Sequence, residues 1–203
     1  MILPMFPLQT VVFPFTAVPL RVFESRYQML LDRVMTVDGR FGIVLIERGQ
    51  ETGGGDTRHS VGTLVKVASI AAIPNSPDRA IVVAGHQRIR ILSWLVDDPY
   101  PRAVVEEDPD PDPGPSVDLQ PALGALRRLL ALASELGADV AGIGLELADD
   151  SLAASYQLAA LCPVTSFDSQ RLLEAVGASA RLDLARSLLD DRAELLLLQL
   201  SSQ

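Results

Sequence analysis

The sequence contains one lysine, Lys66, against sixteen arginines. A phosphate-binding loop of the Walker type requires a lysine directly after its glycines. The run from Gly53 to Gly55 is followed by Asp56 instead, and we interpret it as a hairpin tip. A catalytic Ser-Lys pair would need Lys66, which the alternation of its neighbours places on the outward face of a strand. The chain therefore lacks the residues for both kinds of chemistry.

Cysteine and histidine are almost absent, since the chain has only Cys162, His59 and His86. A single cysteine excludes an internal disulfide and a cysteine-based zinc cluster, which is typical of a protein from a reducing compartment. We therefore predict a cytoplasmic protein with neither a metal site nor a cofactor.

An enzymatic alternative would have to use these same few residues. It could combine His86 or His59 with Ser60 or Asp56, or it could use the thiol of Cys162. None of them lies in a nucleophile motif such as Gly-x-Ser-x-Gly. We expect His86 in a turn between strands, His59 in the glycine-rich loop, and Cys162 as a buried apolar thiol at a helix end. An ATP-independent peptidase is thus the less favoured alternative, and we predict no catalytic residue.

Positive charge is scarce in the second half of the chain. Residues 1–107 hold 11 basic and 11 acidic side chains, whereas residues 108–203 hold 6 basic and 15 acidic ones, for a net charge of -9. Binding of nucleic acid depends largely on clustered Lys and Arg that neutralise phosphates. The composition therefore argues against a DNA- or RNA-binding protein.

The first twenty residues carry no charge, but they do not form a membrane helix or a signal peptide. Prolines at positions 4, 7, 14 and 19 interrupt any continuous helix. The first basic residue, Arg21, follows this apolar stretch, whereas in a signal peptide the basic residues come first. We predict a pair of short strands that are buried in a globular domain, and no membrane association.

Apolar periodicity predicts one helix among several strands in the first half. Tyr27, Leu30, Leu31, Val34 and Met35 define one face of a helix that ends before Gly39. Strands are predicted at Phe41 to Ile46, Val61 to Ile73, Ala80 to Ala84, Arg88 to Trp94 and Arg102 to Glu106. About six strands with one inserted helix indicate a strongly bent sheet or a partly closed barrel.

An acidic, proline-rich connector separates these strands from a helical second half. The residues from 108 to 115 alternate Asp with Pro, which prevents helix and sheet and favours a stiff extended linker. We predict an α+β chain with a β subdomain at 1–107, a linker at 108–117 and a helical subdomain at 118–203. Helices are expected from Leu119 to Leu136, from Ser151 to Pro163, from Ser166 to Gly177 and from Ser179 to Leu200.

An ordered set of segments resembles the N-terminal substrate-binding domain of the Lon protease family. The segments that carry this resemblance are Leu3-Pro4-Met5-Phe6-Pro7-Leu8-Gln9-Thr10-Val11-Val12-Phe13-Pro14, Val18-Pro19-Leu20-Arg21-Val22-Phe23-Glu24, Arg26-Tyr27, Val61-Gly62-Thr63, Gly85-His86-Gln87-Arg88-Ile89-Arg90-Ile91, Pro99-Tyr100-Pro101-Arg102-Ala103, Val104-Val105-Glu106, Leu161-Cys162-Pro163-Val164 and Gln170-Arg171-Leu172-Leu173-Glu174-Ala175. Because they span nearly the whole chain in the expected order, the resemblance concerns the architecture.

The resemblance implies a PUA-like β pseudo-barrel followed by an α-helical bundle. The family's ATPase and protease parts would continue beyond Gln203, so the expectation is a stand-alone substrate-binding domain. Its implied function is that of a non-catalytic protein- or peptide-binding module. The expected partners are unfolded or client proteins, and a protease or chaperone, while the oligomeric state stays open.

The sequence suggests two candidate surfaces for binding a polypeptide partner. One is the loop around Phe13 and Phe15 together with Phe23 and Tyr27, because aromatic side chains beside a proline at a tight bend are costly to expose. Arg21 and Glu24 flank these aromatics and are expected to form a local ion pair. The other is a groove between the two subdomains, for which the sequence provides no residue list.

A small-ligand-binding barrel is the alternative function, and it rests on the only tryptophan. Alternation from Arg88 to Trp94 puts Trp94 on the same face as Arg90 and Leu92. A half-exposed tryptophan on that face would line a pocket or an interface. The competing interpretation is that Trp94 caps the barrel against the linker or the helices.

Overall fold

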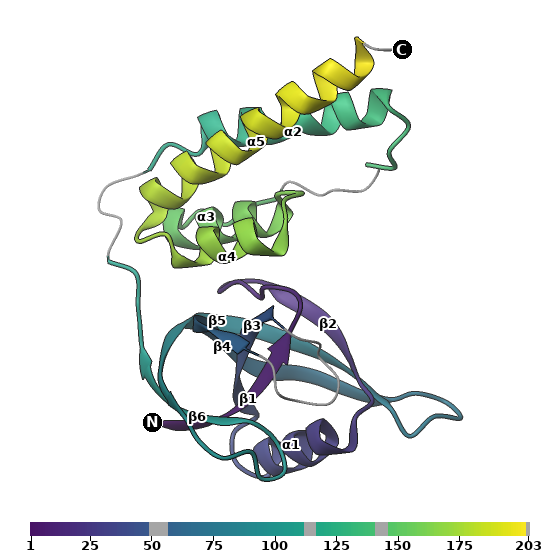
Figure 1. The fold of residues 1–203 in the computed structure, drawn as a ribbon, viewed down its shortest axis with the longest axis vertical. Coiled ribbons are helices and arrows are strands. Elements are labelled where there is room, and N and C mark those ends of the chain that lie inside the picture. Colours follow the sequence, from purple (N-terminus) through teal and green to yellow (C-terminus); the bar gives the residue numbers. More distant parts are fainter. Residues whose placement is uncertain (49–56, 112–116, 141–145, 202–203) are drawn as a thin grey trace. The chain divides into compact units, whose positions relative to one another are not determined.

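The apolar runs of the first half form one mixed sheet of six strands in a computed structural model of the chain (Figure 1). The structure describes residues 1–48, 57–111, 117–140 and 146–201. The strands are β1 (Ile2–Leu8), β2 (Ala17–Val22), β3 (Arg40–Arg48), β4 (Thr57–Ala72), β5 (Arg79–Trp94) and β6 (Arg102–Glu107). The glycine-rich segment predicted as a hairpin tip lies outside the described residues.

The sheet closes on itself. Its strand order is β2-β5-β4-β3-β1-β6, and β6 also pairs with β5. The β1–β3 pair is parallel, whereas the other pairs are antiparallel. Because β5 is 16 residues long, its first half pairs with β2 and its second half with β6. The two prolines of β1 at positions 4 and 7 are accommodated between β3 and β6.

The prediction of two separate strands at 80–84 and 88–94, joined by a turn at His86, was wrong. The two segments form the single strand β5, and the register against β4 shifts from Leu64 opposite Gln87 to Val65 opposite Gly85. His86 is therefore the extra residue of a β-bulge. A one-residue slip moves later side chains to the other face of a sheet. This is why Ile81 and Ile89, both odd-numbered, belong to different core clusters.

The predicted side-chain face of Trp94 was also wrong, because β5 contains a second bulge. Ile91 pairs with Val105 and Ser93 pairs with Val104, so Leu92 is an additional residue. Trp94 therefore turns toward the cluster that includes Ile89 and Ile91, and it packs against that cluster while remaining partly buried.

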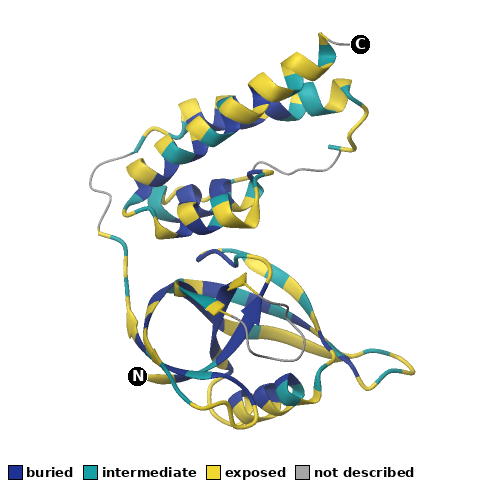
Figure 2. Cartoon of the chain, viewed as in Figure 1, coloured by how far each residue is buried: buried dark blue, intermediate teal, exposed yellow. Residues whose placement is uncertain are grey.

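Buried positions, dark blue in Figure 2, run along the strands of the sheet. Their side chains form two clusters on opposite faces, since neighbouring residues such as Ile43 and Val44 belong to different clusters. One is built from Leu3, Met5, Val44, Leu64, Ile89, Ile91, Ala103 and Val105. The other includes the helix α1 (Ser25–Met35), whose Tyr27 stacks on Phe6 of β1 with 4.2 Å between the ring centroids. The helix follows its predicted apolar face, except that Met35 is 48% exposed.

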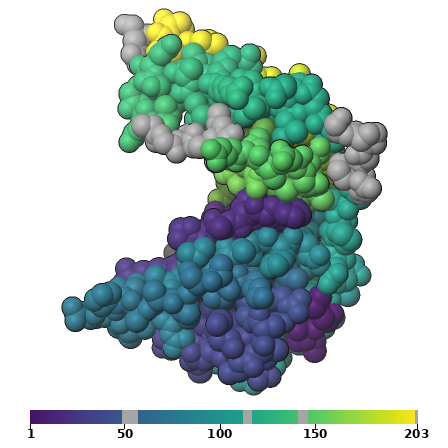
Figure 3. Space-filling model, turned by 180° about the vertical axis from the view of Figure 1, so that it is seen from behind, coloured from purple at the N-terminus to yellow at the C-terminus, as the bar shows by residue number. Residues whose placement is uncertain are grey.

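The β4–β5 turn projects from the first unit, as Figure 3 shows in blue near residue 75. Ile73 donates a backbone hydrogen bond to Asp78 across this turn, and Asn75 has a φ of 59°. Asparagine tolerates this left-handed conformation better than most residues do. In this projecting arm, β2 pairs with the first half of β5 and forms an edge of the sheet.

The second half forms four described helices, in close agreement with the predicted ones. They are α2 (Gln120–Glu135), α3 (Ser151–Leu161), α4 (Ser166–Glu174) and α5 (Ala178–Leu200). Asp150 and Thr165 cap α3 and α4 by accepting hydrogen bonds from the backbone N–H groups of Ala153 and Asp168. The chain divides into two compact units, residues 1–109 and 110–203.

Residues of the predicted linker contribute to both units. Asp108 pairs with the buried side chain of Arg88 at 3.3 Å and with Arg90 at 3.1 Å in the first unit. Asp110 pairs with Arg181 of α5 at 2.6 Å in the second unit, and both side chains of this pair are at most 1% exposed. Residues 112–116 lie outside the described part of the chain.

The Asp110–Arg181 pair is the centre of a buried hydrogen-bond network in the helical unit. Tyr156 and the backbone N–H of Gly177 donate hydrogen bonds to the Asp110 carboxylate. Arg181 donates to the backbone carbonyls of Leu172 and Ala175 and to the hydroxyl of Ser155, and its guanidinium lies 3.5 Å from the Tyr156 ring centroid. One side chain thereby connects the segment at Asp110 with α3, α4 and α5. Such a satisfied network specifies a unique packing.

Replacing the Asp110 carboxylate should make the helical unit less stable and change its response to acid. Burial raises the pKa of Asp110, but the hydrogen bonds from Tyr156 and Gly177 and the charge of Arg181 outweigh burial, so the pKa lies below its ordinary value of 3.8. Its stabilising contribution is therefore present above that value and is lost as the pH falls through the lower folded pKa.

Asp110→Asn should lower the free energy of unfolding at pH 7 by about 3–5 kcal/mol, because it leaves the Arg181 charge buried without a counter-ion. Urea unfolding followed by helical circular dichroism from pH 7 to pH 2 would measure both effects. Asp183→Asn, an exposed site on the same helix, is the matched control. Equal acid dependence in wild type and Asp110→Asn would contradict this role for the carboxylate.

Cys162 should be chemically inert while the protein is folded. The thiol lies after α3, is 8% exposed and contacts the carbonyl oxygen of Leu158 at 3.3 Å. Burial raises its pKa to about 12, and the thiolate is the reactive form. A thiol-specific colorimetric reagent at pH 8 should react with Cys162 only after denaturation. Rapid reaction of the native protein would show that the thiol is accessible.

Candidate binding surface

The loop between β1 and β2 crosses β5 in direct backbone contact. A Cβ added at Gly85 would lie 2.1 Å from the carbonyl oxygen of Phe13, so this strand position requires glycine. The backbone N–H of Phe15 donates to the oxygen of Gly85 at 2.9 Å, and the N–H of Gly85 donates to the oxygen of Thr16 at 2.8 Å. The hydroxyl of Thr63 also donates to the oxygen of Val12 at 2.5 Å. These bonds hold the loop on the sheet.

Phe15 is displayed by this loop in a strained conformation. Its φ is 58°, in the left-handed region that bulky residues rarely adopt, and 45% of the residue is exposed. Phe13 and Val12 anchor the loop, since they are 4% and 1% exposed. Strained backbone that the surrounding structure holds in place is concentrated at functional sites. The loop thus leaves Phe15 about half exposed to solvent.

The bulge at His86 directly follows the glycine that supports Phe15. His86 is exposed, and bulges are common next to binding sites because they redirect side chains. We name Phe15, Gly85 and His86 the crossover surface. The sequence pattern indicated Phe15 as a candidate, but not its contact with Gly85 beside His86. An isolated glycine inside a strand pattern is a known sign of a bulge or a close backbone approach, and it would have pointed to them.

The aromatic cluster predicted around this loop does not form. Phe13 and Tyr27, at 4% and 2% exposure, are core residues and are not available to a partner. Phe23 is 52% exposed, but it lies beyond the far end of β2 from Phe15. The six residues of β2 span about 20 Å. Phe15 and Phe23 therefore belong to separate surfaces.

The predicted ion pair between Arg21 and Glu24 is replaced by two other pairs. Arg21 donates to Asp78 from its Nε at 2.8 Å and from a terminal nitrogen at 2.6 Å. Glu24 pairs with Arg26 at 3.0 Å. Asp78 comes from the β4–β5 turn, so Arg21 links the edge strand β2 to the base of that turn. The prediction rested on the spacing of three residues between Arg21 and Glu24, which contains no information about Asp78, 57 residues away from Arg21.

Trp94 interacts with Arg58, whose guanidinium lies 4.4 Å from the ring centroid and also 3.6 Å from Asp97. The ring is thus covered by a cation on one side and packs on the core on the other. Trp94 does not line the pocket described below. Trp94 therefore lies between Arg58 and the core of the first unit.

Among the described residues, the candidates for catalysis are spread over three places: His59 and Ser60 lie on β4, His86 lies at a bulge of β5, and Cys162 is buried in the helical unit. Asp56 lies outside the described residues. In the described ranges, no group of three or more His, Cys, Asp or Glu side chains is placed to bind a metal ion. None of the helices described combines the length and apolar character needed to cross a membrane.

Solved structures of Lon N-terminal domains share this fold. A Lon N-terminal domain protein from Xanthomonas campestris superposes with a TM-score of 0.66 at 25% sequence identity, covering 90% of this chain and 95% of the other. The N-terminal domain of the Mycobacterium avium complex Lon protease superposes with a TM-score of 0.63 at 19% identity, covering 94% and 99%. This chain therefore has the fold of Lon N-terminal domains.

Sequence comparison leads to the same family. Lon protease 2 of Herpetosiphon aurantiacus is 26% identical over 186 residues, which are 89% of this chain but only 22% of that protein. The chain thus spans less than a quarter of the length of this relative. A family model described as the ATP-dependent protease La (LON) substrate-binding domain matches residues 2–191. This chain therefore belongs to the LON substrate-binding domain family.

Proposed function

We propose that this protein is a non-catalytic binding module for unfolded or client polypeptides, and that the crossover surface contacts them. Two observations support the proposal. The matched family is defined by substrate binding and the match does not include ATPase or protease parts. Within the fold, Phe15 is an exposed aromatic that is held rigidly by backbone contacts on Gly85. The exposed and fixed Phe15 is the observation that supports the choice of this surface.

A rigid aromatic residue is a suitable anchor for a polypeptide without fixed structure. Its ring offers a large apolar contact area at little cost in conformational entropy, because its backbone is already fixed. Aromatic anchors often account for most of the binding energy of an interface. The ring of Phe15 would pack against apolar side chains that a folded client keeps buried, which favours unfolded segments.

The remaining parts of this proposal concern the cellular setting and the finer fold. We propose that the module acts in the cytoplasm, next to a protease or chaperone that processes the bound client. We likewise propose that the closed sheet is a PUA-like pseudo-barrel and that the helices form a bundle. The Asp110–Arg181 network supports a rigid helical unit.

Changing Phe15 should weaken binding of an unfolded protein about tenfold or more, without loss of fold. Phe15→Asn removes the ring but tolerates the left-handed backbone, whereas Phe15→Trp keeps an aromatic side chain and should bind. A reduced, alkylated and fluorescently labelled model protein would report affinity through fluorescence anisotropy. Phe23→Ala and Phe167→Ala, which remove rings that are 52% and 64% exposed elsewhere, are matched controls.

Equal losses in all four variants, or no loss in Phe15→Asn, would overturn the role of this surface. A peptide hydrolysis assay without ATP on the same preparations tests the non-catalytic part of the proposal. Turnover that co-purifies with the protein would contradict that part.

Gly85→Ala should disturb the crossover surface by pushing the β1–β2 loop away from β5. The added methyl group would collide with the Phe13 carbonyl oxygen at 2.1 Å, and backbone cannot yield as a flexible side chain does. We expect destabilisation by about 1–3 kcal/mol together with weaker client binding. Thermal unfolding and the anisotropy assay would measure the two effects. Wild-type stability would contradict the close packing of loop and strand.

A further inference from the structure

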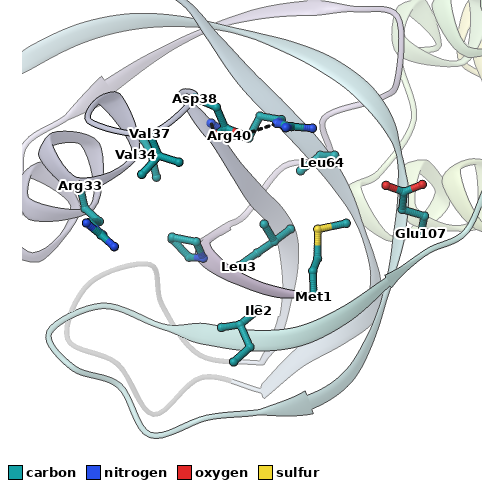
Figure 4. Close-up of a pocket in the computed structure, with 11 residues that line it drawn as sticks. Met1, Ile2, Leu3, Arg33, Val34, Val37, Asp38, Arg40, Leu64 and Glu107 are labelled. Atoms are coloured by element: carbon teal, nitrogen blue, oxygen red, sulfur yellow. Dashed lines mark hydrogen bonds and ion pairs between the residues drawn. The ribbon is translucent and has the colours of Figure 1, made fainter.

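A pocket of about 370 Å³ opens in the first unit (Figure 4), and none of the residues of the crossover surface lines it. It lies between the start of β1, the end of α1 with the turn that follows, and Glu107 at the end of β6. Its floor is apolar, since Leu3, Val34 and Leu64 are each at most 8% exposed. A cavity of this volume falls within the range of small-molecule sites.

Apolar side chains also surround the mouth of this pocket. Met1, Ile2 and Val37 line it and are 53%, 61% and 69% exposed. Exposed aliphatic groups of this size around one cavity are unfavourable in water, and a ligand with an apolar body would cover them.

Four charged side chains line the pocket, and Met1, which also lines it, carries the N-terminal ammonium, which donates to the backbone carbonyl oxygen of Val105 at 2.6 Å. Two of the four charged side chains neutralise each other. The Nε of Arg40 donates to Asp38 at 2.6 Å, and the backbone N–H of Arg40 donates to the same carboxylate at 3.1 Å. These two hydrogen bonds lower the pKa of Asp38 below its ordinary value of 3.8, and the bond from the Arg40 side chain has the larger effect. Asp38 is thus ionised at neutral pH and balances Arg40.

The other two charged residues, Arg33 and Glu107, are left without an internal counter-charge. Within the part of the chain that the structure describes, neither side chain has an ion-pair or hydrogen-bond partner. Figure 4 shows them on opposite sides of the pocket, with Leu3 and Met1 between them. The pocket thus offers the Arg33 cation at one side and the Glu107 anion at the other. Between them lie the apolar side chains of Leu3 and Met1, and the ammonium of Met1 is bonded to the Val105 carbonyl oxygen.

We propose that this pocket binds a short apolar peptide with both ends free, whose carboxylate lies at Arg33 and whose ammonium group lies at Glu107. A cavity of this volume would be about 9 Å across if it were spherical. Two or three peptide residues span about 7–10 Å, which matches that width. The charges of a single amino acid are too close together to reach both sides.

The test is a calorimetric titration with the tripeptide Leu-Gly-Leu and with its N-acetylated, C-amidated and doubly capped forms. The protein should carry any affinity tag at its C-terminal end, because residues 1 and 2 line the pocket. The free tripeptide should bind saturably, and each cap should weaken binding about twofold to fivefold, since it removes one ion pair with an exposed side chain. Raising the salt concentration should weaken binding of the free form more than that of the doubly capped form, because exposed charges are screened.

Variants assign each end of the peptide. Arg33→Gln should remove the preference for a free carboxylate but keep the preference for a free amine, and Glu107→Gln should do the reverse. Glu106→Gln, which removes the neighbouring carboxylate outside the pocket, and Arg127→Gln on α2 are matched controls that should bind as wild type does. Circular dichroism would verify that every variant is folded.

Three results would overturn the proposal. The first is equal affinity for free and capped peptides, which indicates unspecific apolar contact. The second is unchanged end preference in both pocket variants. The third is no saturable binding at millimolar peptide. Because Phe15 is not part of this pocket, Phe15→Asn should leave tripeptide binding unchanged, so failure here is distinct from failure at the crossover surface.

Discussion

Closure of the sheet depends on β5, which must pair with three neighbours along its 16 residues. A regular strand of that length would keep the same side chains on the same face throughout. The bulges at His86 and Leu92 prevent this, and each one moves the following side chains to the other face. One strand can therefore supply Ile81 to the core under α1 and Ile89 to the core on the other face. The Phe15 loop crosses the strand next to the first bulge, where Gly85 allows backbone contact.

The helical unit depends on a different kind of constraint, a buried charge pair. Its helices are short, and the 23-residue α5 carries leucines on several sides, so apolar periodicity alone does not define one packing. Arg181 resolves this ambiguity because its guanidinium needs Asp110, Ser155 and two backbone carbonyls at the same time. Only an arrangement that places α3, α4 and α5 around this side chain satisfies all of these bonds. We regard specificity of packing as the main contribution of this network.

Local signals predicted the helices well and the charged contacts poorly. Glycine at 137 and 177, with φ of 85° and 86°, and the cap at Thr165 determine where helices end and begin through neighbouring residues alone. Bulges depend on how a strand fits two partners, so Gly85 and His86 appeared as a turn. Asp110 was assigned to a linker because the residues around it alternate Asp with Pro. Its partner Arg181 is 71 residues away, so no local pattern indicates the pair. The pocket brings Arg33 and Glu107 together from elements far apart in the chain, which a sequence pattern does not reveal.

The central claim is that an unfolded client contacts the crossover surface around Phe15. Hydrogen–deuterium exchange measured by mass spectrometry, with and without an excess of a permanently unfolded protein, tests it without any mutation. The account predicts slower exchange in the peptides that contain residues 13–17 and 84–87, while the peptides of α5 are unchanged. Slower exchange confined to other segments, or no change at a client concentration where binding is saturated, would contradict it.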